Sequence, residues 1–309
     1  KLTGGDDLRR IVESGIQHVY IDTDRGLDDQ EAVAADVVQA AVEQEIVAAM
    51  SAPDDTQVRV SVREEMARAR KVHEQAHKVV RSMMGDVRLG KAVSLDDAEP
   101  VVEAITSSVL RNSNALMGLI GIKNKDDYTF LHSVSVCTLM IAFGRSLGLA
   151  GEELRQGGIG GLLHDIGKMK VPDEVLNKPG RLTDAEFDLI KKHPGDGHAV
   201  LLETAGIGAV PLDITRHHHE RLDGSGYPDR LAGDAISVMA RMAAIVDVYD
   251  AITADRCYHK GMPAAEALRK MWEWSSAHFD QKLLQAFMRC VGIYPVGSLV
   301  RLESGRLGV

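Results

Sequence analysis

The feature that most constrains this chain is a run of three adjacent histidines, His217 to His219, inside a segment with helical character. The run continues through a glutamate and an aspartate into a Gly-Tyr-Pro turn at residues 226–228. Three protonated imidazoles in a row would repel one another, so a fold that packs them must keep them neutral. A bound metal does so, because it takes the lone pair that a proton would otherwise occupy. The alternative is a solvated or tag-like run, but a tag would lie at a terminus.

A second histidine lies beside an aspartate at the end of an apolar, glycine-rich segment. The stretch Gly160-Gly-Leu-Leu-His-Asp-Ile-Gly-Lys168 predicts a buried helix that ends at His164 and Asp165. The imidazole supplies one nitrogen ligand, and the carboxylate can bridge two ions. Alone this pair is a weak signal. Combined with the histidine run and the Gly-Tyr-Pro turn, it indicates a metal site.

Composition narrows the class of protein. The length of 309 residues suggests about two domains, and the scarcity of aromatic residues, 4%, suits packed helices. A formal net charge of -9 argues against binding to a nucleic-acid polymer, so a phosphate ligand would need local basic residues or metals. Three widely spaced cysteines predict no disulfide framework and fit a reducing cytoplasm. No apolar run reaches about 18 residues, so we expect no membrane span and no signal peptide.

Hydrophobic periodicity predicts three parts in the chain. Residues 1–55 combine short helical stretches with one strand, which indicates a small α+β N-terminal domain. We expect this domain to be regulatory. Residues 56–100 form a linker whose long helix, 56–84, carries a narrow apolar seam at steps of three and four residues. We expect this seam to contact the catalytic domain or to form a homodimer with a second copy. Its members are Val58, Val62, Met66, Ala69, Val72, Ala76, Val79 and Met83.

The remaining residues, 101–309, are predicted to form a helical domain with strands only at its end. A capping box at 94–97 opens a helix that tolerates Pro100 and runs to about Ile120, and His132 lies near the start of the next helix. Residues 171–180 are expected to form a loop, and a second capping box at 183–186 opens a helix that ends near His193. Further helices are expected over 236–252, 263–274 and 281–290, followed by a short β-hairpin over 294–309.

These motifs together resemble one family, the HD-GYP domains, a subgroup of the HD metal-dependent phosphohydrolases. The resemblance runs from about Asp126 to the C-terminus, and residues 1–55 resemble a domain of unknown function that often precedes HD-GYP domains. It implies a mainly α fold and a phosphodiesterase that hydrolyses cyclic di-GMP to pGpG, with further hydrolysis to GMP left open. The implied partners are cyclic di-GMP, pGpG and a signalling protein.

The resemblance also implies a two-metal site in which a bridging hydroxide is the nucleophile. Iron or manganese is the first expectation for both ions, with nickel or zinc as alternatives. One ion would take His132, His164 and Asp247, the other would take His193, His218 and His219, and Asp165 would bridge them. Asp165 and Lys168 are the expected catalytic residues. Counting back from Glu220 selects His218 and His219 as the ligand pair and leaves His217 as a surface or supporting residue.

Substrate contacts are expected around this centre. The residues that the family motifs implicate are Lys168, Gly226, Tyr227, Pro228, Asp250, Arg256, Tyr258 and Lys260. Cys257 and His259 depart from the family pattern, which usually has a proline and a basic residue there. Asp223 is expected to orient a histidine.

Three questions stay open from the sequence. One alternative is a cyclic di-GMP receptor with little turnover, and another is an HD hydrolase of a different nucleotide. The third question is the number of ions, because some HD-GYP proteins hold a third ion with a glutamate one turn before the first histidine. This chain has Tyr128 at that position, and a neutral phenol is a poor ligand, so two ions are predicted.

Overall fold

The structure is a computed structural model that describes residues 60–120, 128–255, 260–275, 277–292, 300–301 and 304–308. The predicted α+β domain over residues 1–55 lies outside the described residues, as do Arg256 and Tyr258. The described part is mainly helical, as predicted. None of its helices is long and apolar enough to cross a membrane.

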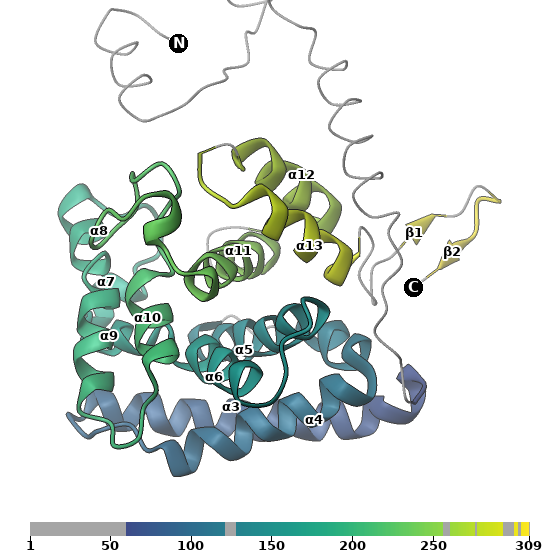
Figure 1. Ribbon diagram of the computed structural model, residues 1–309, viewed down its shortest axis with the longest axis horizontal. Helices are drawn as coiled ribbons and strands as arrows, with labels where there is room; N and C mark the ends of the chain where they lie inside the picture. The colour runs from purple at the N-terminus through teal and green to yellow at the C-terminus, as the bar shows by residue number, and fades with distance from the viewer. Residues whose placement is uncertain are drawn as a thin grey trace, which may run out of the picture.

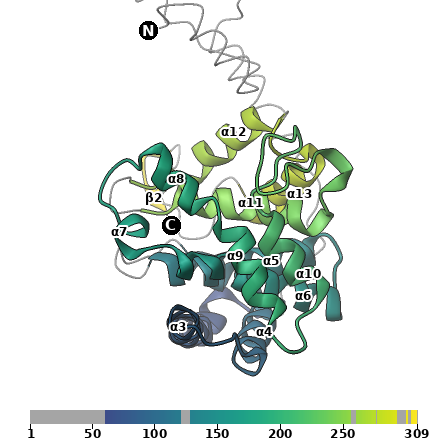
Figure 2. The ribbon, with the colours of Figure 1, turned by 90° about the vertical axis from the view of Figure 1, so that its left-hand side faces the viewer.

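The helices form a base, a central layer and an upper group (Figure 1). Two long helices, α3 (Val62–Arg88) and α4 (Leu95–Ile120), form the base and lie side by side, as the end-on view shows (Figure 2). The central helices α5 (Tyr128–Ser146) and α6 (Gly151–Leu163) pack on this base. On the far side of α5 lie α11 (Val238–Thr253), α12 (Ala264–Trp274) and α13 (Gln281–Val291).

Shorter elements cover one end of the central layer (Figure 1). A 3-10 turn, η2 (Ile166–Lys170), follows α6, and a further turn, η3 (Gly233–Ala235), precedes α11. The short helices are α7 (Asp173–Leu176), α8 (Asp184–Ile190), α9 (His193–Leu202) and α10 (Ala209–His217). The predicted hairpin is confirmed as β1 (Val300–Arg301) paired antiparallel with β2 (Leu307–Gly308).

Two sequence expectations about these short elements were wrong. The segment expected to be a loop contains the single helical turn α7. The helix opened by the Thr183 capping box ends at Ile190, and His193 begins the separate helix α9, with Pro194 in its first turn. Proline favours the first turn of a helix because its missing N–H would have no partner there. The break therefore sets His193 at a helix start, close to η2.

The long helix α3 begins later than expected and buries a broader face. Ser61 is extended and forms a capping box with Glu64, so the helix starts at Val62 rather than at residue 56. The predicted seam residues Ala69, Ala76 and Met83 are buried, but so are Val80, Met84 and Val87. The face is broad because α3 packs against both α4 and α5, so the contact with the catalytic helices is made within the chain.

Glycines allow α6 to run through the centre of the molecule. A Cβ atom on Gly160 would lie 2.5 Å from the Ile214 side chain, and one on Gly161 would lie 3.1 Å from the Cα atom of Cys137. Both glycines are buried, so larger residues would push α10 and α5 away from α6. The close approach matters because α6 ends at the His–Asp pair.

An ion pair between buried Glu65 and half-buried Arg111 joins the two base helices. Glu65 of α3 is fully buried, and its carboxylate accepts hydrogen bonds from Arg111 Nε and Nη2, both at 2.7 Å. Ser108 donates a third bond at 2.8 Å. Close by, α4 is kinked at Asn112, whose side-chain amide donates to the Val60 carbonyl at 2.8 Å. These contacts fix the start of α3 against the middle of α4.

Replacing Glu65 with alanine should remove this anchor. Arg111 and Ser108 would lose their acceptor at a buried interface, and we expect the free energy of unfolding to fall by about 3 kcal/mol near pH 7. Urea denaturation measures this change. The control is Glu103→Ala, an exposed position of α4, where the change should stay within about 0.5 kcal/mol. An equal fall in the free energy of unfolding in Glu65→Ala and Glu103→Ala would contradict the anchoring role of Glu65.

The same pair predicts a pH dependence of stability. Hydrogen bonds from Arg111 hold the pKa of the Glu65 carboxyl below its ordinary value despite burial. A carboxyl group whose pKa is lower in the folded protein than in the unfolded chain stabilises the fold at pH values above its unfolded pKa, about 4.3. This stabilisation is lost as the pH falls through the pKa of the folded state. The stability difference between wild type and Glu65→Ala should therefore be constant between about pH 6 and 8 and shrink below about pH 4. A difference that grew on acidification would overturn this explanation.

Candidate metal centre

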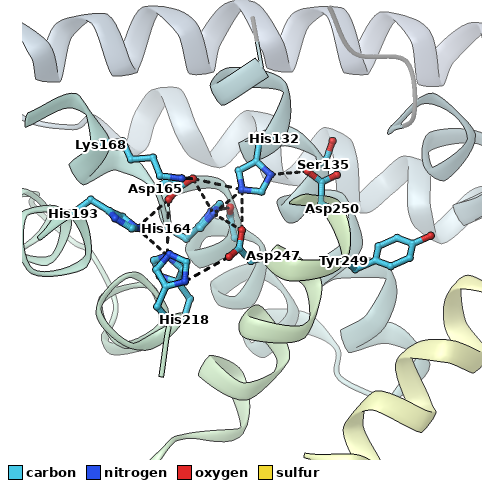
Figure 3. Close-up of polar contacts among 12 residues, drawn as sticks. His132, Ser135, His164, Asp165, Lys168, His193, His218, Asp247, Tyr249 and Asp250 are labelled. Atoms are coloured by element: carbon cyan, nitrogen blue, oxygen red, sulfur yellow. Dashed lines mark hydrogen bonds and ion pairs between the residues drawn. The ribbon is translucent and has the colours of Figure 1, made fainter. Parts of the chain in front are cut away.

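Seven side chains meet where α5, α6, η2, α9, α10 and α11 converge (Figure 3). They fall into two groups, and in each group one ligand atom per residue lies within 4.8 Å of all the others. The first group is His132, His164 and Asp247, and the second is Asp165, His193, His218 and His219. The structure therefore brings together all seven residues that the motifs implicated, in the two sets that were expected.

The Asp165 carboxylate lies between the two groups, with one oxygen facing each. Its Oδ1 atom lies 3.2 Å from His193 Nε2 and 3.8 Å from His218 Nε2. Its Oδ2 atom lies 3.3 Å from His164 Nε2 and 3.5 Å from His132 Nε2. Asp165 is fully buried at the junction of α6 and η2, so its position is set by the scaffold.

The backbone orients three of the imidazoles. The Nδ1 atoms of His164, His193 and His218 lie 2.9, 2.7 and 3.0 Å from the carbonyl oxygen three residues before each of them. A carbonyl oxygen only accepts, so these Nδ1 atoms carry the hydrogen and donate it. In the neutral ring the Nε2 atom then presents a lone pair, and all three Nε2 atoms point into the cluster.

The Nε2 atoms of the cluster lie close together in pairs, an arrangement that a cation between them would stabilise. His132 Nε2 lies 3.3 Å from His164 Nε2, and His193 Nε2 lies 3.3 Å from His218 Nε2. Two facing lone pairs repel unless a proton or a metal ion lies near them. The donors are imidazole nitrogen and carboxylate oxygen, which suit iron, manganese, nickel and zinc. The residues present therefore fit divalent ions in both groups.

The charges of the cluster also favour bound cations. Burial drives the pKa of His218 well below its ordinary value and lowers that of His219 to about 3. Burial opposes ionisation of Asp165, but His164 and Lys168 hold its pKa well below the ordinary range. Burial also lowers the pKa of His164, yet the neighbouring carboxylates outweigh it and raise the value to about 10. Ionised Asp165 beside the neutral imidazoles of His218 and His219 favours a bound cation.

Asp250 lies behind His132 rather than at an opening of the site. The Asp250 side chain is fully buried, and its Oδ2 atom lies 2.6 Å from His132 Nδ1 (Figure 3). This contact orients the fourth imidazole with a carboxylate where the other three use carbonyl oxygens. A direct substrate contact, which was expected from the sequence, does not fit this buried position.

The Gly-Tyr-Pro loop packs directly on the cluster. The Tyr227 ring lies 4.8 Å from the His219 ring at 31°, and the Tyr227 N–H donates to the His219 carbonyl at 3.2 Å. Gly226 is buried, and a Cβ atom there would lie 2.5 Å from Glu220 Cα and from the Arg221 nitrogen. The loop can approach this closely only with glycine at 226. Pro228 is partly exposed next to it.

The basic residues expected to bind phosphate are only partly described. Lys168 Nζ lies 2.6 Å from Asp165 Oδ2, and 21% of its side chain is exposed. The HDxGK spacing that selected Lys168 also places Gly167, where a Cβ atom would lie 2.0 Å from the His193 carbonyl oxygen. Gly167 thus lets η2 touch α9, a role that the sequence reasoning missed although the motif contains it. Lys260 is exposed.

Two carboxylates near the cluster differ from expectation. Asp223 accepts from the Ser225 N–H at 2.8 Å and shapes its own turn, and among the described residues its electrostatic histidine partner is His278, which lies outside the two metal groups. Glu220, which was used only to count the histidines, accepts from the N–H groups of Asp229 at 2.7 Å and Leu231 at 3.1 Å. It thereby folds the loop back onto the end of α10. The position of Glu220 directly after the histidine pair was the sequence signal from which this role could have been predicted.

Comparisons with known proteins agree with this architecture. Residues 119–283 match the HD domain family, and residues 1–98 match a domain of unknown function, DUF3391. A solved structure, the HDG"Y"P protein Bd1817 from Bdellovibrio bacteriovorus, shares the fold with a TM-score of 0.60 at 19% identity. The matched region covers 82% of this chain and 78% of the Bd1817 chain.

Characterised bacterial proteins extend the similarity. Cyclic di-GMP phosphodiesterase PA4108 of Pseudomonas aeruginosa is 50% identical over 98% of this chain and 72% of its own length. The cyclic di-GMP phosphodiesterase response regulator RpfG of Xanthomonas campestris is 38% identical over 52% of this chain and 42% of its own. The 3'3'-cGAMP-specific phosphodiesterase 1 of Vibrio cholerae is 38% identical over 53% of this chain and 38% of its own.

An all-helical scaffold with a buried His–Asp cluster at the end of a central helix defines an HD-type metal-dependent hydrolase. The chain belongs to the HD domain family, in its HD-GYP subgroup, and carries the DUF3391 domain before it.

The contact between Asp250 and His132 predicts an effect on metal affinity. Asp250→Ala should lower the affinity of the first group for a divalent ion by about 10- to 100-fold, because the imidazole loses the partner that sets its tautomer. Competition against a calibrated chelator measures this affinity. The control Glu203→Ala alters an exposed carboxylate at the end of α9 and should leave affinity unchanged. Unchanged affinity in Asp250→Ala would contradict the role.

Proposed function

We propose that this protein is a metal-dependent phosphodiesterase whose substrate is cyclic di-GMP and whose first product is pGpG. The observation that carries the proposal is the convergence of seven buried or half-buried ligand side chains in two groups around Asp165. The similarity to cyclic di-GMP phosphodiesterase PA4108 over 98% of this chain supports the choice of substrate. Hydrolysis adds water across one phosphodiester bond, so the phosphorus–O3′ bond breaks and the 3′ oxygen receives a proton.

The residues of the two groups would hold two ions. His132, His164 and Asp247 would hold one, and His193, His218 and His219 would hold the other, with Asp165 between them. The two oxygens of Asp165, each facing one group, support this division. When bound, such ions lower the pKa of a water molecule and neutralise phosphate charge.

The protein itself would bind and orient the substrate. The Lys168 ammonium contacts Asp165 of the cluster, and the partial exposure of its side chain supports contact with a phosphate oxygen. We propose Arg256, Tyr258 and Lys260 as further substrate contacts, since a guanidinium binds phosphate in two-pronged geometry. Asp250 we assign to orienting His132.

A second candidate substrate is 3'3'-cGAMP. The 3'3'-cGAMP-specific phosphodiesterase 1 of Vibrio cholerae matches 53% of this chain, and the cyclic di-GMP phosphodiesterase response regulator RpfG matches 52%. Both ligands are cyclic dinucleotides with two phosphodiester bonds, so the metal groups would treat them alike. A receptor with little turnover is not favoured, because the chain keeps the full set of ligands.

Activity assays test the proposal directly. Full-length protein should hydrolyse cyclic di-GMP faster than 3'3'-cGAMP, pGpG or a cyclic mononucleotide. The double variant His164→Ala, Asp165→Ala should lose at least about 99% of this turnover and most of its metal, because it removes a ligand from one group and the shared carboxylate. Activity at a tenth of wild type in a metal-depleted double variant would reject the mechanism.

The number and identity of the ions form a separate prediction. We propose two ions per chain, because Tyr128 stands where some HD-GYP proteins have a glutamate that binds a third ion. We propose iron or manganese for both ions, since imidazole and carboxylate ligands suit these metals. Elemental analysis of anaerobically purified protein should give about two metal atoms per chain. An anomalous-scattering map with a third fully occupied peak beside Tyr128 would overturn the count.

The parts before the catalytic helices have a proposed regulatory role. The DUF3391 match ends at residue 98, which supports a boundary near residue 100 between the catalytic region, 101–309, and the rest. We propose that residues 1–55 receive a signal, from a partner protein or within a homodimer, and that the linker over 56–100 carries it. The packing of α3 on α4 and α5 supports this route.

A further inference from the structure

The extra histidine of the run, His217, lies in a network of charged groups beside the metal centre. His217 Nδ1 lies 2.7 Å from Asp213 Oδ1, and His217 Nε2 lies 3.0 Å from Asp229 Oδ2. Arg216 donates to both oxygens of Asp229, at 2.6 and 2.8 Å. Asp213 also accepts a hydrogen bond from Ser237, the residue that caps α11. We call Asp213, Arg216, His217 and Asp229 the loop clamp.

The loop clamp connects two elements that both border the metal centre. Three of its members, Asp213, Arg216 and His217, lie on α10, immediately before the ligand pair His218 and His219. The fourth, Asp229, directly follows the Gly-Tyr-Pro turn. Holding Asp229 therefore ties the loop to the same helix end that carries two metal ligands.

The loop clamp holds the chain close to Tyr227. Tyr227 is two residues before Asp229, and its ring stacks on His219. The loop is also attached through the Tyr227 N–H, which donates to the His219 carbonyl, and through the Asp229 N–H, which donates to the Glu220 carboxylate. The clamp adds the only charged side-chain contacts to Asp229 among the described residues, including the paired bonds from Arg216 that fix direction as well as distance.

We propose that the loop clamp positions the Gly-Tyr-Pro loop for binding of the cyclic dinucleotide, and that His217 and Arg216 are positioning residues for the reaction. This inference rests on the proposed function. The clamp residues touch neither Asp165 nor the Nε2 atoms of the ligands, so they act through the loop. A loop held in place contributes to the bound substrate and to the transition state alike, which affects KM more than kcat.

Substitution of Asp229 in the full-length, metal-loaded protein tests the clamp. Asp229→Ala should raise KM for cyclic di-GMP about tenfold, the scale of a lost charge-assisted hydrogen bond, with kcat within about twofold of wild type. Metal content should stay at the wild-type value. Asp229→Asn keeps one acceptor for Arg216 and should recover part of the loss. The control is Asp234→Ala, a fully exposed carboxylate in the following segment, which should match wild type.

A second readout does not depend on activity. Arg221 and Arg230 are exposed at the two ends of the loop, so trypsin can report how often the loop opens. Cleavage at Arg230 should be about tenfold faster in Asp229→Ala than in wild type, in line with the loss of one charged hydrogen bond. If Asp229→Ala does not fold, His217→Gln takes its place in both assays, with the same expectations.

The outcomes separate the clamp from the proposed function. Unchanged KM together with unchanged cleavage would overturn the clamp, as would a variant that loses kcat and metal together. A wild-type protein that hydrolyses no cyclic dinucleotide contradicts the proposed function alone. In that case the cleavage rate decides whether the clamp holds the loop.

Discussion

Asp165 is a fully buried carboxylate that faces two groups of imidazoles at once, and the arrangement around it depends on that position. A buried carboxylate is costly unless it is paired, and here Lys168 pairs with Oδ2 while the buried Oδ1 atom has no hydrogen-bond partner among the described residues. Because one oxygen serves each group, the two groups must lie on opposite sides of one side chain. The scaffold therefore has to deliver ligands from several helices to a single point at the end of α6.

The scaffold achieves this with backbone contacts more than with side chains. Three imidazoles are oriented by the carbonyl oxygen three residues before them, which in each case belongs to the last turn of a helix, so a helix end supplies the group that fixes the tautomer. His132 lies within α5, where carbonyl groups are already bonded, and it uses Asp250 of α11 instead. Glycines at 160, 161 and 167 let α6 and η2 touch α10, α5 and α9. The geometry of the ligands is thus a consequence of close helix packing.

The end of α10 connects candidate metal ligands to the Gly-Tyr-Pro loop. It supplies two candidate ligands, the glutamate that folds the following loop back, and the arginine and histidine that hold Asp229. Motion of this helix end would disturb the ligands and the loop together. Relatives named for cyclic di-GMP and for 3'3'-cGAMP are both similar to this chain, so differences in substrate are expected to arise in such surrounding segments rather than at the candidate metal ligands.

Sequence alone determined the helical class and most helix positions, because helical periodicity is a local signal. It also selected the seven residues that converge, through the resemblance of their motifs to the HD-GYP family. Tertiary structure decided what those signals do not contain. Asp250 orients His132 from 118 residues away, α3 buries a wide face because two helices pack on it, and His217 meets Asp229 only once the loop has folded back. Such contacts depend on which surfaces meet, and a side chain's partner across the fold is set by packing rather than by its neighbours in the chain.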